Sequence, residues 1–512
     1  MRDINKYQVP QLPALIAFLC ACVMLTALPL VFRDAFFDIN RVKVELVRGV
    51  APAMCLTSLL CCVAAKQRMP RCRDARGVLA ALACFLAACL ISAARQGFSP
   101  AVLEGSEGRC SGLLFLLSCG AASLAIALGC LRGQISAALA CLAVVLVALL
   151  GVLNAFGVDP LRFYEGIKQG QENQFLSTIG NLDFFGGYVA MMCPLLAGQS
   201  ICAGRKSAAA IYALGTIAAQ AGVAASGSDG AFLALQLGFA ALAALSGDDL
   251  ARLSRTLLLW ALSFAALPVM FRLLLARGQE GLYTGLYLAL RESGAAVCSC
   301  AVLAAAAVLC RRLYAKGVHA PGRQRMLAVL AVLLVLALII GCAAIAYFTL
   351  VDPECELGAL SAYLRFDDNW GTRRGFVYKR SVRALADYSP LDWLFGRGVD
   401  NARSILTPYF DDPAMLRYGV FNDAHCQPLQ YLLTTGLFGA LSLLALHALT
   451  LRACWRRAGD SALMTGVCAA FAAYTAVALV SAAQPILMVT YLSLAALAVS
   501  AMLHSAKEEG NT

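Results

Sequence analysis

Residues 327–350 read LAVLAVLLVLALIIGCAAIAYFTL, a run with no charged side chain. A helix rises about 1.5 Å per residue, so a run of this length crosses about 30 Å of hydrocarbon. Similar runs recur along the chain, which has 512 residues and is 61% hydrophobic and only 14% charged. A soluble chain would carry about 25% charged residues. The sequence therefore predicts an all-α polytopic membrane protein, because each spanning helix satisfies its own backbone hydrogen bonds.

We expect about fourteen transmembrane helices, with a range of 12 to 14. More than half of the 41 Lys and Arg residues lie in segments on the side of the N-terminus. The positive-inside rule then predicts a multi-pass protein of the cytoplasmic membrane with both termini in the cytoplasm. The runs that predict the spans are 11–32, 49–65, 77–94, 112–131, 135–154, 183–203, 207–225, 230–246, 256–271, 292–310, 327–350, 426–450, 462–482 and 484–503.

The chain divides into four parts by the spacing of these runs. Residues 1–150 and 151–350 hold N-terminal and central transmembrane helices, and 426–512 holds the C-terminal ones. Residues 351–425, here called the long segment, form the longest connection and lie on the outer side. This segment contains Trp370 and Trp393 and many charges. Because it has too many aromatic residues for disorder, we expect short helices on the outer membrane surface.

Charge and cysteine content exclude several classes of protein. The net charge of +11 does not indicate nucleic-acid binding, because the basic residues sit mainly at membrane boundaries rather than in one patch. The expected partner is the lipid bilayer. Most of the 22 cysteines lie within apolar runs, and no matched CxxC pairs occur, so neither a zinc site nor a disulfide framework is supported. The first apolar run lacks a clear cleavage site and indicates a first span rather than a signal peptide.

Of the four histidines, one lies on the predicted outer side and is a candidate catalytic residue. His425 follows Asp423 where the long segment enters the next span, whereas His319, His447 and His504 lie in or near the cytoplasmic side. A histidine exchanges a proton near neutral pH, and a nearby carboxylate can orient its ring and raise its basicity. The alternative is a helix-capping or interfacial histidine.

A basic helix is predicted within the long segment. Its apolar face would carry Tyr378, Val382 and Leu385, and the cations would occupy the other faces. The helix would bind either anionic lipid head groups or a lipid-linked phosphate, whose oxygens fit the guanidinium fork. The cations are Arg373, Arg374, Lys379, Arg380 and Arg383.

Further motifs on the predicted outer side are weaker evidence for a functional site. Arg397 stands in a tight glycine turn, Leu394-Phe-Gly-Arg-Gly398, and Arg109 stands at the start of a span, where a structural role is equally open. The acidic pairs Asp367-Asp368 and Asp411-Asp412 could be metal ligands, but no third ligand is apparent. We therefore expect no metal and no cofactor.

Four segments, in order, resemble the O-antigen ligase and polysaccharide polymerase family of membrane glycosyltransferases, across roughly residues 150–450. The most telling is Asp423-Ala-His-Cys-Gln-Pro-Leu-Gln-Tyr-Leu-Leu-Thr-Thr-Gly-Leu-Phe-Gly439, similar to the family's aspartate–alanine–histidine–asparagine segment and the helix after it. The others are Arg374-Gly-Phe-Val-Tyr-Lys379, Pro390-Leu-Asp-Trp-Leu-Phe-Gly-Arg-Gly398 and Ser177-Thr-Ile-Gly-Asn-Leu-Asp-Phe-Phe-Gly-Gly-Tyr188.

The resemblance implies a C-type glycosyltransferase fold with its active site on the outer face. Such enzymes transfer a glycan from undecaprenyl diphosphate to a glycan, lipid or protein acceptor, with inversion and without a metal. Carried over, His425 would act as general base, with Asp423 beside it. Arg374 would hold the donor diphosphate and stabilise the leaving group. The remaining substrate-binding residues would be Arg373, Arg380, Arg397, Arg109 and Asn181.

The sequence departs from the family pattern at three places. Cys426-Gln427-Pro428 follows His425 where asparagine, a variable residue and tyrosine are usual, and Tyr378 stands at the usual tryptophan. Asp229 stands where many relatives carry an arginine, so Arg109 or Arg397 would have to replace that cation. These departures favour a polymerase or another lipid-linked glycan transferase over a lipopolysaccharide ligase. A transporter or flippase of lipid-linked saccharides, or a membrane scaffold, is the competing class.

Overall fold

A computed structural model describes residues 12–66, 70–168, 171–278, 285–410, 421–459, 461–482 and 484–509. Its helices confirm the prediction of an all-α polytopic membrane protein. The described residues include a single two-stranded sheet, in which β1 (Phe175–Leu176) pairs antiparallel with β2 (Gly180–Asn181). A short 3-10 turn, η2 (Glu172–Gln174), precedes this hairpin.

Among the described residues, twelve helices are long and apolar enough to cross a membrane. The first is continuous through α2 (Leu12–Cys22), the π-helical turn η1 (Val23–Ala27) and α3 (Leu28–Leu30). Two shorter apolar helices, α7 (Leu113–Leu128) and α11 (Asp229–Leu245), fall on the other two predicted spans. The remaining eleven long helices are α4 (Ile39–Ala64), α5 (Arg73–Arg95), α8 (Gln134–Ala155), α9 (Leu182–Cys202), α10 (Lys206–Ser226), α12 (Leu250–Leu275), α14 (Ala295–Ala315), α15 (Arg323–Leu350), α21 (Gln427–Arg457), α22 (Ala462–Val480) and α23 (Pro485–Glu509).

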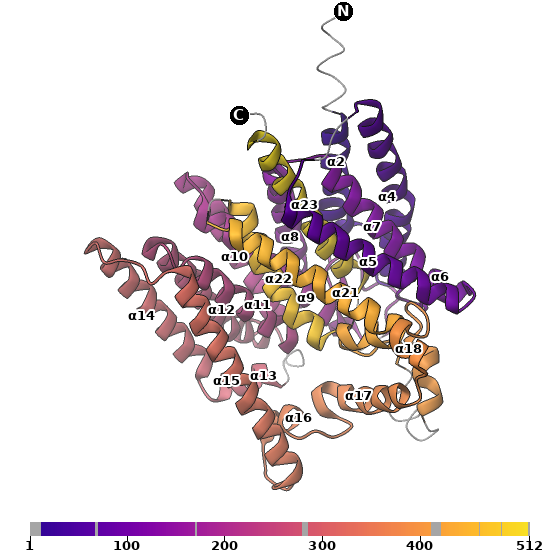
Figure 1. Cartoon of the computed structure of the whole chain (residues 1–512). Coiled ribbons are helices and arrows are strands. Elements are labelled where there is room, and N and C mark those ends of the chain that lie inside the picture. Colours follow the sequence, from indigo (N-terminus) through magenta and orange to yellow (C-terminus); the bar gives the residue numbers. More distant parts are fainter. Residues whose placement is uncertain are drawn as a thin grey trace, which may run out of the picture.

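The first and last described helices have their terminal ends on the same side of the bundle (Figure 1). Arg132, which follows α7, pairs with Glu508 near the end of α23 at 2.7 Å. A side chain at Gly129 would meet Ala17 in α2. On this side Asp74, at the start of α5, also pairs with Arg457, at the end of α21. The long segment lies at the opposite end, here called the site side (Figure 1).

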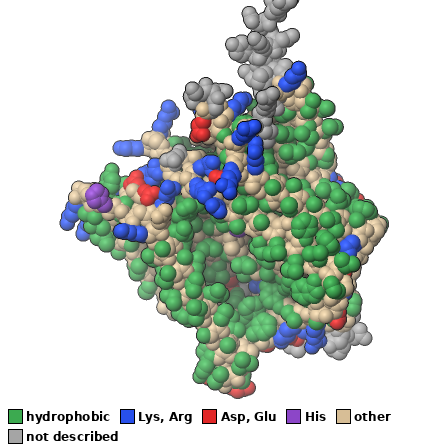
Figure 2. Space-filling model, viewed as in Figure 1, with side chains coloured by type: hydrophobic (Ala, Val, Ile, Leu, Met, Phe, Trp, Pro, Cys, Tyr) green, Lys and Arg blue, Asp and Glu red, His purple; other side chains and the backbone are tan. Residues whose placement is uncertain are grey.

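The exterior of the bundle is mainly hydrophobic, as Figure 2 shows for one face. The clearest case is α15, none of whose residues is buried. An apolar helix with every face exposed is not stabilised by water, so its surroundings are lipid acyl chains.

Short helices make up the long segment, as predicted. They are η4 (Gly358–Leu360), α16 (Ser361–Leu364), α17 (Trp370–Ala386), α18 (Pro390–Phe395), α19 (Ala402–Leu406) and η5 (Thr407–Tyr409). A small hydrophobic core joins α17, α19 and the residues around η5, and it includes Phe376, Leu406 and Phe410. Leu433 of α21 belongs to the same core, so the segment is packed onto the bundle rather than spread over the membrane.

Two glycine motifs pack directly against each other where α18 meets α21. A side chain at Gly396 would lie 2.3 Å from the carbonyl of Thr434, and one at Gly436 would lie 2.4 Å from the backbone of Leu394. Gly436 has a φ of 67° and interrupts α21. The backbone N–H of Gly398 donates to the Thr434 carbonyl at 3.0 Å. This close contact fixes the long segment to α21, and it requires both glycines.

The structure corrects two details. Helix α4 begins at Ile39 rather than near residue 49, because its charged first turns continue beyond the apolar stretch and pair with one another, as Arg41 does with Glu45. On α17 the predicted apolar face is confirmed at Leu385, which is buried, but it is wrong at Val382, which is 65% exposed. Phe376 and Val377 are fully buried instead. The small residues Ser381 and Ala384 complete the buried face, and the hydrophobicity of Val382 concealed this register.

Candidate active site

His425 lies between the long segment and α21, in a backbone conformation that is rare for a residue with a side chain. Its φ is 50°. Its backbone N–H donates to Oδ1 of Asp423 at 2.5 Å, and its carbonyl accepts from the hydroxyl of Tyr378 at 3.3 Å. The ring of Phe421 contacts the imidazole edge-on at 5.7 Å. These contacts hold the backbone so that the strained conformation is maintained.

Asp423 is completely buried and forms an ion pair with Arg109, whose side chain is 13% exposed. The structure thus brings Arg109, Asp423 and His425 together, three residues that the sequence places in the site. The sequence predicts that a carboxylate orients the imidazole ring of His425, but the contact in the structure is different. The hydrogen bond from His425 to Asp423 comes from the backbone amide, and the carboxylate acts on the imidazole through its charge.

Arg109 is held in place by a loop at residues 105–112, here called the Arg109 loop. Asp400 of the long segment accepts hydrogen bonds from the backbone N–H groups of Ser106, at 2.8 Å, and Ser111, at 3.3 Å. The hydroxyl of Ser106 donates to the Asp400 carbonyl at 2.6 Å. Burial raises the pKa of Asp400 to about 6, although nearby Arg109 and the amide donors oppose the shift. Asp400 therefore joins the first half of the chain to the long segment.

Arg374 follows a left-handed turn within α17. Gly371, Thr372 and Arg373 have φ angles of 57°, 61° and 73°. A left-handed conformation costs about 1–2 kcal/mol for each residue that has a Cβ atom. The Nη1 group of Arg374 donates back to the carbonyl of Gly371 at 2.8 Å. Its Nε is buried and has no hydrogen-bond partner among the described residues. A buried donor without an acceptor is costly, so this group is suited to an anionic ligand.

Arg374 lines a narrow cavity of about 10 Å³, room for about one water molecule, at the site-side ends of the spanning helices. Asp183, in the first turn of α9, and Ser228, which caps α11, line it too. The Ser228 hydroxyl donates to Asp183 at 2.5 Å. Figure 2 shows a hollow on this face, walled mainly by hydrophobic side chains, with acidic and basic side chains visible in its depth. Asp183 was missed from the sequence, although it lies two residues after Asn181.

Burial lowers the pKa of His425 below its ordinary value of about 6.5. The charges of Asp423 and Asp183 act in the opposite direction, while those of Arg109 and Arg374 add to the lowering. His425 is therefore close enough to both arginines to respond to their charge. The imidazole is neutral at pH 7, which is the form that accepts a proton.

The remaining predicted cations occupy other positions. Arg380 lies over the ring of Phe376, 3.9 Å from its centroid, and pairs with Asp368 at 3.3 Å. Arg373 is exposed within the left-handed turn. The guanidinium of Arg397 lies 4.3 Å from the ring centroid of Tyr388, and it pairs with Asp392 at 3.2 Å. These contacts stabilise the glycine turn.

Asn181 and Asp229 both accept hydrogen bonds from the first residues of a helix. The side chain of Asn181 caps α9 by accepting from the backbone N–H of Asp183 at 3.0 Å. Asp229 accepts from the backbone N–H groups of Leu286, at 3.0 Å, and Tyr287, at 3.2 Å, and from the hydroxyl of Tyr363. It thereby caps α13 (Leu286–Glu292) instead of supplying a cation.

The acidic pair considered as a metal site is engaged with protein groups. Asp368 pairs with Lys379 at 2.9 Å as well as with Arg380, and Asp367 accepts from the backbone N–H of Asn369 at 2.8 Å. These contacts give both carboxylates a role in shaping the turn before Arg374. The second pair, at residues 411 and 412, lies outside the described residues.

Comparison with known families identifies the region that carries this site. Residues 281–444 match the family described as O-Antigen ligase. The match covers α13 to α21, and it includes Arg374, Asp423 and His425. The match confirms the resemblance of this part of the chain to the O-antigen ligase family. No curated protein matches the chain significantly.

Proposed function

We propose that the protein transfers a glycan from a polyprenyl diphosphate, of the undecaprenyl type, to an acceptor hydroxyl at the outer face of the cytoplasmic membrane. The match of residues 281–444 to the O-antigen ligase family supports a membrane enzyme that acts on lipid-linked glycans. The observation that carries the finer proposal is the pairing of two groups. The guanidinium of Arg374, whose buried Nε has no acceptor among the described residues, lies close enough to the imidazole of His425 to lower its pKa.

In this reaction the acceptor oxygen attacks the anomeric carbon of the donor sugar from the side opposite the diphosphate. The bond between that carbon and the phosphate oxygen breaks as the new glycosidic bond forms, so the configuration inverts. The proton of the acceptor hydroxyl passes to the imidazole of His425. The electron pair of the broken bond leaves with the diphosphate, and the fixed charge of Arg374 stabilises it.

The hydrophobic walls of the hollow support a lipid-linked donor. A polyprenyl chain partitions into apolar surroundings, whereas a nucleotide sugar has no apolar part that would need them. The distribution of basic residues supports the proposed orientation, in which the site side is outside and both termini are cytoplasmic. Asp423 and the Arg109 loop are positioning elements. Asp423 accepts the backbone N–H of His425, and the loop holds Arg109, which pairs with Asp423.

The test uses the purified protein in lipid nanodiscs, with a glycosylated polyprenyl diphosphate as donor and the corresponding glycan as acceptor. We expect wild-type protein to form product, and His425→Ala and Arg374→Ala to lower kcat by about 10²–10³-fold. The matched controls are His319→Ala and Arg403→Ala, which change exposed residues away from these contacts. Transfer that is undiminished in the first two variants would overturn the site. Translocation of the donor without bond formation would instead identify a flippase.

A further inference from the structure

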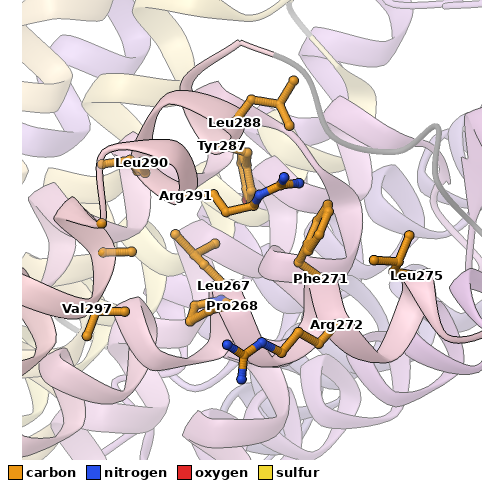
Figure 3. A pocket seen from close by; sticks show the side chains of 12 residues that line it. Leu267, Pro268, Phe271, Arg272, Leu275, Tyr287, Leu288, Leu290, Arg291 and Val297 are labelled. Atoms are coloured by element: carbon orange, nitrogen blue, oxygen red, sulfur yellow. The ribbon is translucent and has the colours of Figure 1, made fainter.

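A second cleft lies on the site side, between α12, α13 and α14 (Figure 3). It is partly open and has a volume of about 340 Å³, and most of its lining is apolar. Two of its lining residues are charged, and both are arginines: Arg272 in the last turn of α12 and Arg291 in the last turn of α13. Figure 3 shows both arginine side chains among the apolar ones. The cleft therefore combines a hydrophobic wall with two cations.

The cleft opens towards lipid rather than towards water. Val297, which lines it, is 60% exposed, and Val269 and Leu273 on the neighbouring turns of α12 are 56% and 50% exposed. Exposed aliphatic side chains on membrane helices contact acyl chains. The two arginines stand where the apolar part of each helix ends, which is the level of the lipid phosphates.

The two arginines of the cleft have no acidic partner among the residues that the structure describes. No carboxylate lines it, and no ion pair joins Arg272 or Arg291 to a carboxylate within the described residues. The guanidinium of Arg291 lies 4.2 Å from the ring centroid of Phe271, which orients it while its donors remain free for an acceptor. Guanidinium groups bind phosphate oxygens in bidentate fashion, so the complementary ligand is a lipid that carries phosphate.

A short chain of hydrogen bonds connects the cleft with Arg374. Tyr287, a lining residue, donates its backbone N–H to Asp229 at 3.2 Å, and Asp229 also accepts from the hydroxyl of Tyr363. The carbonyl of Tyr363 accepts from the indole of Trp370 at 2.7 Å. Trp370 is the first residue of α17, the helix that carries Arg374. The cleft thus adjoins the segment that forms the candidate active site.

We propose that this cleft is a second binding site for the polyprenyl diphosphate carrier, separate from the Arg374 cavity. The chain lies against the apolar wall, and the diphosphate lies between Arg272 and Arg291. The site holds the carrier beside the reaction centre, before transfer or after it. This inference rests on the proposed function for the identity of the ligand, but its test measures binding and does not require transfer.

The experiment measures equilibrium binding of radiolabelled undecaprenyl diphosphate to the full chain in phosphatidylcholine nanodiscs. We expect Arg272→Ala/Arg291→Ala to weaken one class of site by about tenfold or more. Val297→Trp should do the same by filling the cleft without changing its charge. The matched controls are Arg277→Ala, an exposed arginine near the same helix ends, and Val302→Trp, a residue of α14 that is 67% exposed and outside the cleft lining.

Arg374→Ala should leave this class of site intact. In transfer assays the cleft variants should raise KM for the lipid-linked donor by about tenfold, with kcat within about twofold of wild type, since they leave the reacting groups in place. Thermal unfolding of each variant shows whether it is folded, and Arg291→Lys, which retains the charge, should recover part of the affinity.

Two outcomes would overturn the inference. In the first, the cleft variants bind the carrier as wild type does. In the second, phosphatidylglycerol displaces the carrier from the wild-type cleft at equal concentration, which would identify a site for bilayer lipids. If instead the cleft variants lose carrier binding while wild-type protein shows no transfer, the proposed function fails and the binding site stands.

Discussion

Arg109 and Asp423 form a buried ion pair although 314 residues separate them in the chain. Asp423 in turn accepts the backbone N–H of His425. The conformation of the candidate base is therefore set by a residue from the N-terminal helices, outside the part that matches the O-antigen ligase family. Removal of either member of the pair should affect both stability and activity.

Loss of one partner leaves the other charge buried without compensation. We expect Arg109→Ala and Asp423→Asn each to lower the free energy of unfolding by about 3–5 kcal/mol, the usual cost of breaking a buried pair. Transfer activity should fall with it, because the His425 backbone loses its anchor. Thermal unfolding in detergent and initial rates measure the two effects. Arg162→Ala is the control, since its side chain is 80% exposed; equal effects in that variant would contradict a specific role for the pair.

The dependence of activity on pH should show the lowered pKa of His425. The base acts in its neutral form, so the acid limb of the kcat/KM profile should have its midpoint below the ordinary imidazole value of about 6.5. Two variants should move this acid limb in opposite directions. Asp183→Asn removes a charge that raises the pKa and should move the limb to lower pH, whereas Arg374→Gln removes a charge that lowers it and should move the limb to higher pH. Shifts in the same direction would show that His425 is not the titrating group.

The contact between the two glycine motifs predicts a strong effect of one methyl group. Gly436→Ala places a Cβ atom 2.4 Å from the backbone of Leu394, at a φ of 67°. We expect a loss of about 2–4 kcal/mol in the free energy of unfolding, from backbone strain and overpacking together. Gly341→Ala is the matched control, because a side chain there meets nothing within 4 Å. Similar unfolding curves for the two variants would mean that α18 does not contact α21 in this way.

Thr372 tests whether strain in the turn before Arg374 has a function. Thr372→Gly should relieve about 1–2 kcal/mol of left-handed strain, offset in part by the larger conformational entropy that glycine has in the unfolded chain. We expect equal or slightly higher thermal stability, and a higher KM for the donor because Arg374 is less rigidly held. Unchanged kinetics would assign the turn to folding alone. Thr407→Gly, in a 3-10 turn without left-handed residues, is the control.

The sequence was sufficient to predict the helices, because an apolar run of about 20 residues has few other solutions. The start of α4 could not be found in this way, since its first turns carry charges that pair with one another outside the apolar stretch. The exposed Val382 shows that the buried face of α17 could not be predicted fully from hydrophobicity either. Hydrophobicity identifies a helix reliably, but it does not decide which small residues complete the buried side.

The proximity of candidate site residues was predictable where they share one motif, as Asp423 and His425 do, and their roles stay predictions. Asp183 and Asp400 were missed, because their importance comes from contacts with segments far away in the chain. Nothing local distinguishes either carboxylate from an ordinary exposed aspartate. The same reason explains Arg397, which the sequence places near phosphate and which in the structure contacts Tyr388 and Asp392; its role toward substrate stays a prediction.

Helix α5 extends this dependence on the N-terminal helices beyond Arg109. The Ser92 hydroxyl donates to the Thr434 carbonyl at 2.6 Å, and Arg95 binds Asp392 at 2.9 Å. The domain that matches the family therefore depends on helices outside the match and cannot be moved alone into another protein with its site intact. A chimera that grafts residues 281–444 onto another enzyme's helices would inherit His425 without the scaffold that orients it, unless the graft also carries α5 and the Arg109 loop.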